Sequence, residues 1–205
     1  TLVSKRIKVG ATRLRGQAAV HLSAARILQG VDDNQYDLAL TSPPYLNAID
    51  YLRGHRMTLV WLGYDIRQLR ETRSTSVGAE RSMELAADFD IDRFILEADD
   101  ATFGSRHRGW VFRYASDMGK VLSQIQRVTK PGGRVVMVVG NSFIRGAAVD
   151  NAGLIRELAG NRGLEPIRER ERQIPARRRY LPPPSEGKNQ LDGRMGKEVL
   201  TTFAA

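Results

Sequence analysis

The chain has 205 residues, of which 41% are hydrophobic and 27% are charged, and this is the composition of one ordinary globular domain. No apolar run reaches the roughly 20 residues of a membrane-spanning helix, and the absence of cysteine excludes disulfides and thiolate metal sites, as fits a cytoplasmic protein. The net charge of +9 favours a polyanionic partner, nucleic acid first, although a merely basic soluble protein is the simpler alternative.

The first part of the chain predicts a basic arm followed by a main domain. Residues 1–16 contain lysines and arginines but no acidic residue, so we expect them to form the arm. Residues 17–205 form the domain. It begins with a short strand over 18–22, a helix over 24–29 that Gly30 ends, and an apolar strand over 36–41.

The middle of the chain predicts two helices around a segment of different character. Leucines at helical spacing indicate a helix over 51–62. Residues 64–105 are first rich in arginine and then acidic, and we interpret them as an insertion with one helix, a lid or a recognition element. Residues 110–129 show one long apolar stripe, typical of an amphipathic helix, which Pro131 stops.

The last third of the chain completes the sheet. Residues 134–140 are almost wholly apolar, as buried parallel strands are. A helix over 150–159 and two strands over 164–173 and 198–203 follow, with a loop over 177–184 between the strands. This alternation predicts an α/β fold with a parallel sheet, and the last two strands predict an antiparallel hairpin at one edge.

The most informative residues are Thr41-Ser42-Pro43-Pro44-Tyr45, which end the strand over 36–41. Ligands of an open α/β sheet bind beyond the carboxyl ends of its strands. The two prolines restrict the backbone, so the turn presents a hydroxyl and carbonyl oxygens in a fixed array. Such acceptors suit the two protons of an exocyclic amine, and Tyr45 can stack on the ring that carries it. Enzymes hold a base that has left the duplex in this way.

These residues resemble the catalytic motif of the amino-methylating DNA methyltransferases, in which Asp, Asn or Ser precedes Pro-Pro-Tyr or Pro-Pro-Phe. Residues 41–63 are similar to the motif and following helix of a bacterial subgroup of DNA methylases. Residues 127–142 resemble the helix, turn and strand of most Rossmann-type methyltransferases. The last part of the chain resembles the carboxyl-terminal part of the same subgroup, in the segments Arg-Arg-Arg-Tyr-Leu-Pro-Pro-Pro and Lys-Glu-Val-Leu-Thr-Thr-Phe. The resemblance covers roughly residues 18–63 and 107–203; it is specific at 41–45 and generic at 130–140.

The resemblance implies a Rossmann-like fold and methyl transfer from S-adenosyl-L-methionine to DNA, within a restriction-modification setting. Ser42 and the Pro43 carbonyl would accept the amine protons, Pro44 would complete the turn and Tyr45 would stack on the base. Thr41 and Ser42 would contact the cofactor. Motifs with serine are similar to those of enzymes that modify the 4-amino group of cytosine, so we expect cytosine over adenine.

One departure from the family concerns the cofactor. The family binds S-adenosyl-L-methionine largely through a glycine-rich turn after its first strand, and no glycines with that spacing occur here. We therefore expect an incomplete sheet, the catalytic half of a methyltransferase that lacks the cofactor-binding strand. An upstream segment or a second subunit would complete the cofactor site.

Residues just past the motif are further candidates for substrate contact. These candidates are Asn47, Asp50, Tyr51 and Arg53, which we expect to line the base pocket or to contact a phosphate. For Asp50, a role as the cap of the following helix is an equally simple explanation.

Two later segments add candidates. Asn141 follows the strand over 134–140 and either contacts the target or, with Ser142, only closes a turn. The run of Arg177, Arg178 and Arg179 is expected to contact DNA phosphates, with a solvated loop as the alternative.

The sequence also allows other interpretations of the substrate and the function. We expect Trp61 and Trp110 to be core residues, and the three histidines lack metal-ligand spacing, so no metal site is expected. Related Pro-Pro-Tyr motifs serve RNA and protein-amide methyltransferases, which makes an RNA or protein amide the second choice of substrate. A non-catalytic remnant that binds nucleic acid is the alternative from another class, and the missing glycine turn is its best support.

Overall fold

A computed structural model describes residues 18–46, 51–79, 90–96, 103–144, 147–175 and 196–205. The main sheet has four strands in the order β1 (Tyr36–Thr41), β3 (Thr129–Gly140), β7 (Lys197–Ala204) and β6 (Glu165–Gln173). β1 and β3 are parallel, while β7 runs antiparallel to both β3 and β6. The predicted α/β fold with an antiparallel hairpin at one edge is confirmed, and β1 with β3 is the parallel pair of a mixed sheet.

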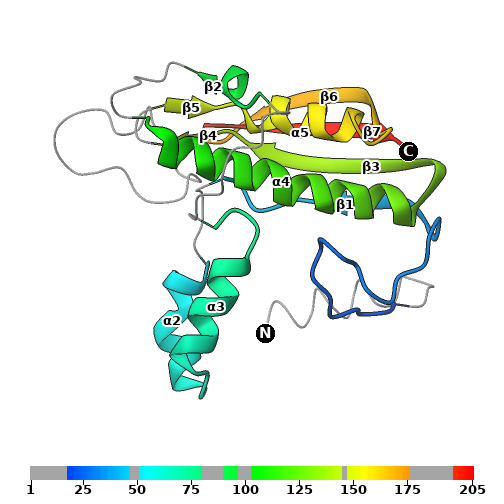
Figure 1. The fold of residues 1–205 in the computed structure, drawn as a ribbon. Coiled ribbons are helices and arrows are strands. Elements are labelled where there is room, and N and C mark those ends of the chain that lie inside the picture. The colour runs from blue at the N-terminus through cyan, green and yellow to red at the C-terminus, as the bar shows by residue number, and fades with distance from the viewer. Residues whose placement is uncertain (1–17, 47–50, 80–89, 97–102, 145–146, 176–195) are drawn as a thin grey trace.

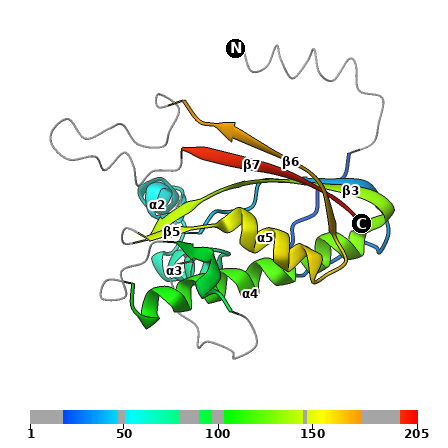
Figure 2. The same ribbon diagram turned by 90° about the horizontal axis from the view of Figure 1, so that it is seen from above.

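Two helices cover one face of this sheet, as Figures 1 and 2 show. One side of α4 (Ser105–Val128) is buried along its length, because its apolar side chains recur at helical spacing and so face the sheet together. α5 (Asn151–Gly160) begins at Asp150, whose carboxylate accepts a hydrogen bond from the Gly153 amide. Both helices pack on the alternate side chains of β3 that face them, Val135, Met137 and Val139. No helix in the described ranges has the length and apolarity that crossing a membrane requires.

A second, smaller sheet was not predicted. It consists of β2 (Ile95–Leu96), β5 (Ala147–Val149) and β4 (Ser142–Ile144), all antiparallel, with the 3-10 helix η1 (Asp92–Phe94) before β2. These strands have two or three residues each, too few to give a readable alternation of polar and apolar side chains. The helix of the predicted insertion is α3 (Ile66–Thr75), and it pairs with α2 (Tyr51–Trp61).

The segment before β1 corrects two predictions. The strand expected over 18–22 and the helix expected over 24–29 are wrong, since residues 18–35 form turns and irregular structure. Val20 and Leu22 are 97% and 105% exposed, so no partner buries the apolar residues that suggested a strand. Arginine contacts hold the segment against α4 instead: Arg26 Nη1 lies 2.7 Å from Asp117 Oδ1, and Arg127 Nη1 donates to the Val31 carbonyl at 2.9 Å.

We predict that Leu122→Ala, which empties a fully buried position on α4, lowers the free energy of unfolding by about 2–5 kcal/mol, because it removes apolar contacts and leaves a cavity. Ile167→Ala on β6 is the control, since that side chain is 50% exposed and should change stability by less than about 1 kcal/mol. Chemical denaturation measures both. Equal losses would contradict a core between α4 and the sheet.

Candidate active site at the carboxyl edge of the sheet

Strand direction brings the proline motif to one edge of the sheet. β1 and β3 are parallel with Thr41 opposite Met137, so Ser42 lies beside Val138. The Ser42 hydroxyl donates to the Val138 carbonyl at 3.3 Å. β6 runs in the same direction as β1, since both lie antiparallel to the direction of β7. The carboxyl ends of β1, β3 and β6 and the first residues of β7 therefore share this edge.

Buried residues on the helix side of the sheet hold the proline turn in place. Pro43 is buried, and the Pro44 carbonyl accepts a hydrogen bond at 3.1 Å from the hydroxyl of Tyr114, a residue only 1% exposed. Gly78 lies against the turn, where an added Cβ would come within 3.4 Å of the Tyr45 carbonyl oxygen. Among the described residues, no hydrogen bond engages the Pro43 carbonyl. The turn is thus rigid, while Ser42 stays exposed.

A second anchor holds the chain directly after the motif. The carbonyl of the buried Leu46 accepts a hydrogen bond from the Ser142 hydroxyl. Asn151 Nδ2 donates to Ser142 Oγ at 2.8 Å and to the Gly140 carbonyl at 2.9 Å. Ser142 and Asn151 are buried, so these bonds join the end of β3, the start of α5 and the motif into one network. For Ser142 the structure therefore supports the turn-closing interpretation.

Tyr45 links the motif to the far side of the sheet. Its hydroxyl lies 3.3 Å from Ser42 Oγ and donates to Glu198 Oε1 at 3.3 Å. Glu198 forms an ion pair with Arg172, whose Nε lies 3.1 Å from Glu198 Oε2. Because Arg172 and Glu198 are paired in register, Ser42, Tyr45, Glu198 and Arg172 make a row across the edge from β1 to β6.

The charge state of Tyr45 follows from this row. Burial raises the pKa of Tyr45, and the negative charge of Glu198 and the hydrogen bond to it raise it further. The neighbouring Ser42 hydroxyl and the positive charge of Arg172 act in the opposite direction and lower this pKa. With a net upward shift, the phenol is neutral near pH 7, so it can donate to Glu198 and keep its ring uncharged for stacking.

The predicted site residues fall into three groups. Ser42, Pro43, Pro44 and Tyr45 are brought together at the edge, with Thr41 as the last residue of β1. Tyr51 and Arg53 lie in the first turn of α2, and Asn141 directly follows β3 with a buried Oδ1 that has no partner among the described residues. The third group lies outside the described residues and stays predicted: Asn47, Asp50, Arg177, Arg178, Arg179 and the basic arm over 1–16.

Sequence reasoning missed three residues that support the motif: Glu198, Arg172 and Tyr114. Glu198 lies in the terminal segment Lys-Glu-Val-Leu-Thr-Thr-Phe, whose resemblance to methylases was a signal without a role attached. Arg172 ends a run of alternating Glu and Arg, and only the register of β6 against β7 shows which arginine faces Glu198. Tyr114 belongs to the apolar stripe predicted over 110–129, and its hydroxyl in addition donates to the Pro44 carbonyl.

Comparison with known proteins finds a distant similarity to DNA modification methyltransferases. No family model matches the chain. The chain is 25% identical over 176 residues to the type II methyltransferase M.BsoBI of Geobacillus stearothermophilus, a match that covers 71% of this chain and 35% of that protein. It therefore spans about a third of the length of the curated relative it matches. This similarity makes the chain a distant relative of DNA modification methyltransferases.

Solved structures of the candidate DNA modification methylase TTHA0409 from Thermus thermophilus are also similar. One covers 90% of this chain and 52% of its own at 15% identity, with a TM-score of 0.45. Another, complexed with S-adenosyl-L-methionine, covers 88% of this chain and 52% of its own at 15% identity, with a TM-score of 0.43.

The row across the edge predicts a measurable shift in a tyrosine titration. We expect the component lost in Tyr45→Phe to titrate above the ordinary tyrosine pKa of 10.0, because burial and Glu198 oppose ionisation. Glu198→Gln removes the negative charge, so this component should move to lower pH. Absorbance at alkaline pH, as the difference between each protein and its Tyr45→Phe form, measures the effect. An unchanged midpoint in Glu198→Gln would contradict the contact between Tyr45 and Glu198.

Proposed function

We propose that this chain is the catalytic portion of a DNA methyltransferase that transfers a methyl group from S-adenosyl-L-methionine to the exocyclic amine of an extruded base, cytosine in preference to adenine. One observation carries the proposal. A rigid Ser-Pro-Pro-Tyr turn lies at the carboxyl edge of an α/β sheet, with the Ser42 hydroxyl exposed and the Pro43 carbonyl without a partner among the described residues. The relationship to DNA modification methyltransferases supports the choice of reaction.

The roles of the motif follow from its hydrogen bonds. Since the Ser42 hydroxyl donates its proton to the Val138 carbonyl, its lone pairs are available to accept a hydrogen bond from an amine. The Pro43 carbonyl is the second acceptor. An amine conjugated to a ring is a poor nucleophile, and two such bonds localise its lone pair on nitrogen. Because the oxygens are already in place, little reorganisation is needed when the amine begins to react.

Tyr45 is the stacking residue of the proposal. Its hydroxyl donates to Glu198 and lies beside Ser42, which fixes the plane of a ring that is half-buried. Stacking of a base on an aromatic ring is worth about 1–3 kcal/mol by alanine substitution. Tyr45 would thus position the ring whose amine Ser42 and Pro43 hold.

The described residues do not by themselves form a site for S-adenosyl-L-methionine, which supplies the methyl group when bound. The described glycines with positive φ are Gly30, Gly63, Gly78, Gly132 and Gly163, and none of them follows the carboxyl end of a strand. In this proposal Thr41 and Ser42 are the described residues that would contact the cofactor, and the rest of its site would come from other groups.

The outer edge of β1 supports a cofactor site that is completed by further polypeptide. In the described sheet β1 pairs with β3 alone. Leu38 and Leu40 are 55% and 70% exposed, although apolar strands of this type are usually covered. We propose that an additional segment or subunit pairs with this edge, covers Leu38 and Leu40 on the face of the sheet away from the core, and brings the cofactor site with it.

Two other functions are tested by the same reagents. RNA or protein-amide methylation would use the same turn, and a non-catalytic remnant would retain the fold for binding nucleic acid. The absence of a glycine turn favours the remnant, whereas the unoccupied acceptors of the turn favour catalysis. Methylation of separate DNA, RNA and protein fractions from one lysate distinguishes the three.

We predict that Ser42→Ala and Tyr45→Ala each lower methyl transfer to DNA by about 100-fold, because each removes one preorganised contact to the amine or its ring. Tyr45→Phe keeps the ring and should retain most of the activity. Transfer of labelled methyl groups is measured with the 205 residues and with the intact product of the gene. Tyr36→Ala is the control, since Tyr36 begins the same strand at the opposite end.

Transfer that survives both Ser42→Ala and Tyr45→Ala would rule out these roles. Absence of transfer by the intact gene product, together with absence of S-adenosyl-L-methionine binding in calorimetry, would favour the remnant.

A further inference from the structure

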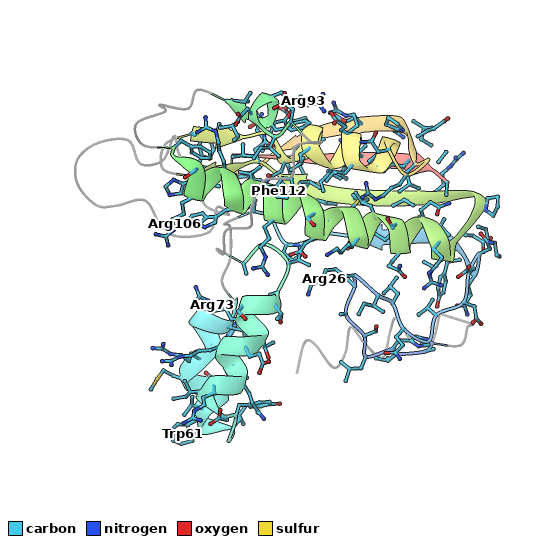
Figure 3. All side chains as sticks on the ribbon, in the orientation of Figure 1. Arg26, Trp61, Arg73, Arg93, Arg106 and Phe112 are labelled. Carbon is cyan, nitrogen blue, oxygen red and sulfur yellow. The ribbon has the colours of Figure 1, made fainter. Side chains whose placement is uncertain are left out.

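A hairpin of two helices leaves the active site and ends in exposed apolar side chains. α2 and α3 project from the body of the molecule, with Trp61 at the far end and Arg73 near the base (Figures 1 and 3). Trp61 was predicted to be a core residue, and that prediction is wrong: its side chain is 91% exposed, whereas Trp110 is 9% exposed and in the core as predicted. Other exposed apolar residues at this end are Met57, Leu62, Tyr64 and Ile66.

Backbone hydrogen bonds fix the conformation of the end of the hairpin, which we call the tip (residues 57–66). The amides of Leu62, Gly63 and Tyr64 donate to carbonyls of the last turn of α2 at 3.0 Å each. Gly63 has φ +87°, a left-handed conformation that glycine adopts without strain. Asp65 then begins α3, because its carboxylate accepts from the amides of Arg67 and Gln68. The apolar side chains are therefore presented on a fixed scaffold.

The base of the hairpin is fixed to the core beside the motif. The Thr75 carbonyl accepts from Arg26 Nη2 at 2.5 Å and the Ser74 carbonyl from Arg113 Nη2 at 2.7 Å. Both arginines also contact the buried Asp117 on α4, at 2.7 Å and 3.6 Å. Since Gly78 packs against the Tyr45 carbonyl, the chain that leaves α3 returns to the active site. Ten residues of α3 reach about 15 Å, the length of roughly four stacked base pairs.

The charge of the hairpin indicates its partner. Residues 51–78 contain five arginines and two acidic residues, which leaves a net charge of +3. Arg56, Arg67 and Arg70 are exposed along the helices that carry the apolar tip. Cationic side chains neutralise phosphates, and apolar side chains inserted between base steps are a known way of holding distorted DNA. A protein partner would suit the apolar tip but not the cationic helices.

We propose that the tip is a DNA-binding wedge, in which Trp61 lies against the bases of the duplex while Arg67 and Arg70 contact its phosphates. This inference rests on the proposed function, because it places the same DNA that offers its base to Ser42 and Tyr45. Distortion of the duplex by the wedge would lower the cost of removing a base from the stack.

Tryptophan fluorescence tests the proposal, because Trp61 and Trp110 are the two tryptophans of the chain. The emission lost in Trp61→Phe is that of Trp61, and acrylamide should quench it readily in the free protein. We expect duplex DNA to quench this emission in a saturable manner and to shield it from acrylamide. In fluorescence anisotropy with a labelled duplex, Trp61→Ala should weaken binding about tenfold. Ile167→Ala, at an exposed apolar position on β6, should leave binding unchanged.

The salt dependence of binding tests the arginines. Arg67→Ala and Arg70→Ala should each reduce the slope of log affinity against log salt by about 1, as the loss of one phosphate contact does. Arg134→Ala is the control, since this exposed arginine lies toward the amino end of β3, away from the active-site edge.

Three results would overturn the wedge. In the first, DNA binds while the emission of Trp61 and the affinity of Trp61→Ala stay unchanged. In the second, the chain binds no duplex. In the third, Trp61 is already shielded from acrylamide in the free protein, and this shielding would indicate a protein partner at the tip. Failure of the proposed function gives a different result, in which methyl transfer is absent while duplex DNA still quenches the emission of Trp61. Conversely, transfer lost in Ser42→Ala with no response of Trp61 to DNA would remove the wedge and leave the proposed function intact.

Discussion

The parallel pairing of β1 with β3 determines where the chemistry of this chain takes place. It brings Ser42 beside Val138 and places the proline turn at the carboxyl edge of the sheet. Tyr114 holds the turn from the helix layer, and Ser142 holds the chain beyond it. If this pairing slipped, the oxygens of the turn would lose their fixed positions, and with them the capacity to hold an amine.

The row of polar groups across the edge extends this constraint to the far strands. Tyr45 is oriented by Glu198, and Glu198 is held by Arg172 on β6, so the antiparallel hairpin at the end of the chain supports a ring near its beginning. The ion pair keeps a carboxylate near the phenol without leaving its charge unbalanced. On the other side of the motif, the hairpin of α2 and α3 is anchored through Arg26 and Arg113 to Asp117, which couples the exposed tip to the core under the active site.

Much of this arrangement was readable from local patterns. The apolar run of β3, the stripe of α4 and the strand before the proline motif all follow from periodicity and turn residues, and the structure confirms them. The prediction of a strand over 18–22 was wrong, because Val20 and Leu22 would form a strand only beside another strand that pairs with them. Trp61 failed because the size of a side chain does not reveal whether its helix packs on the body or leaves it. Glu198 and Arg172 depend on strand register, a property of the whole sheet that no local pattern contains.

The central claim is that Ser42 and Pro43 hold the amine of an extruded base that lies on Tyr45. A crystal structure of the intact gene product bound to a duplex containing its target measures this most directly. The account predicts an extruded base whose amino nitrogen lies within about 2.7–3.2 Å of Ser42 Oγ and of the Pro43 carbonyl oxygen. A base that remains stacked in the duplex, or an amine bound away from this turn, would contradict it.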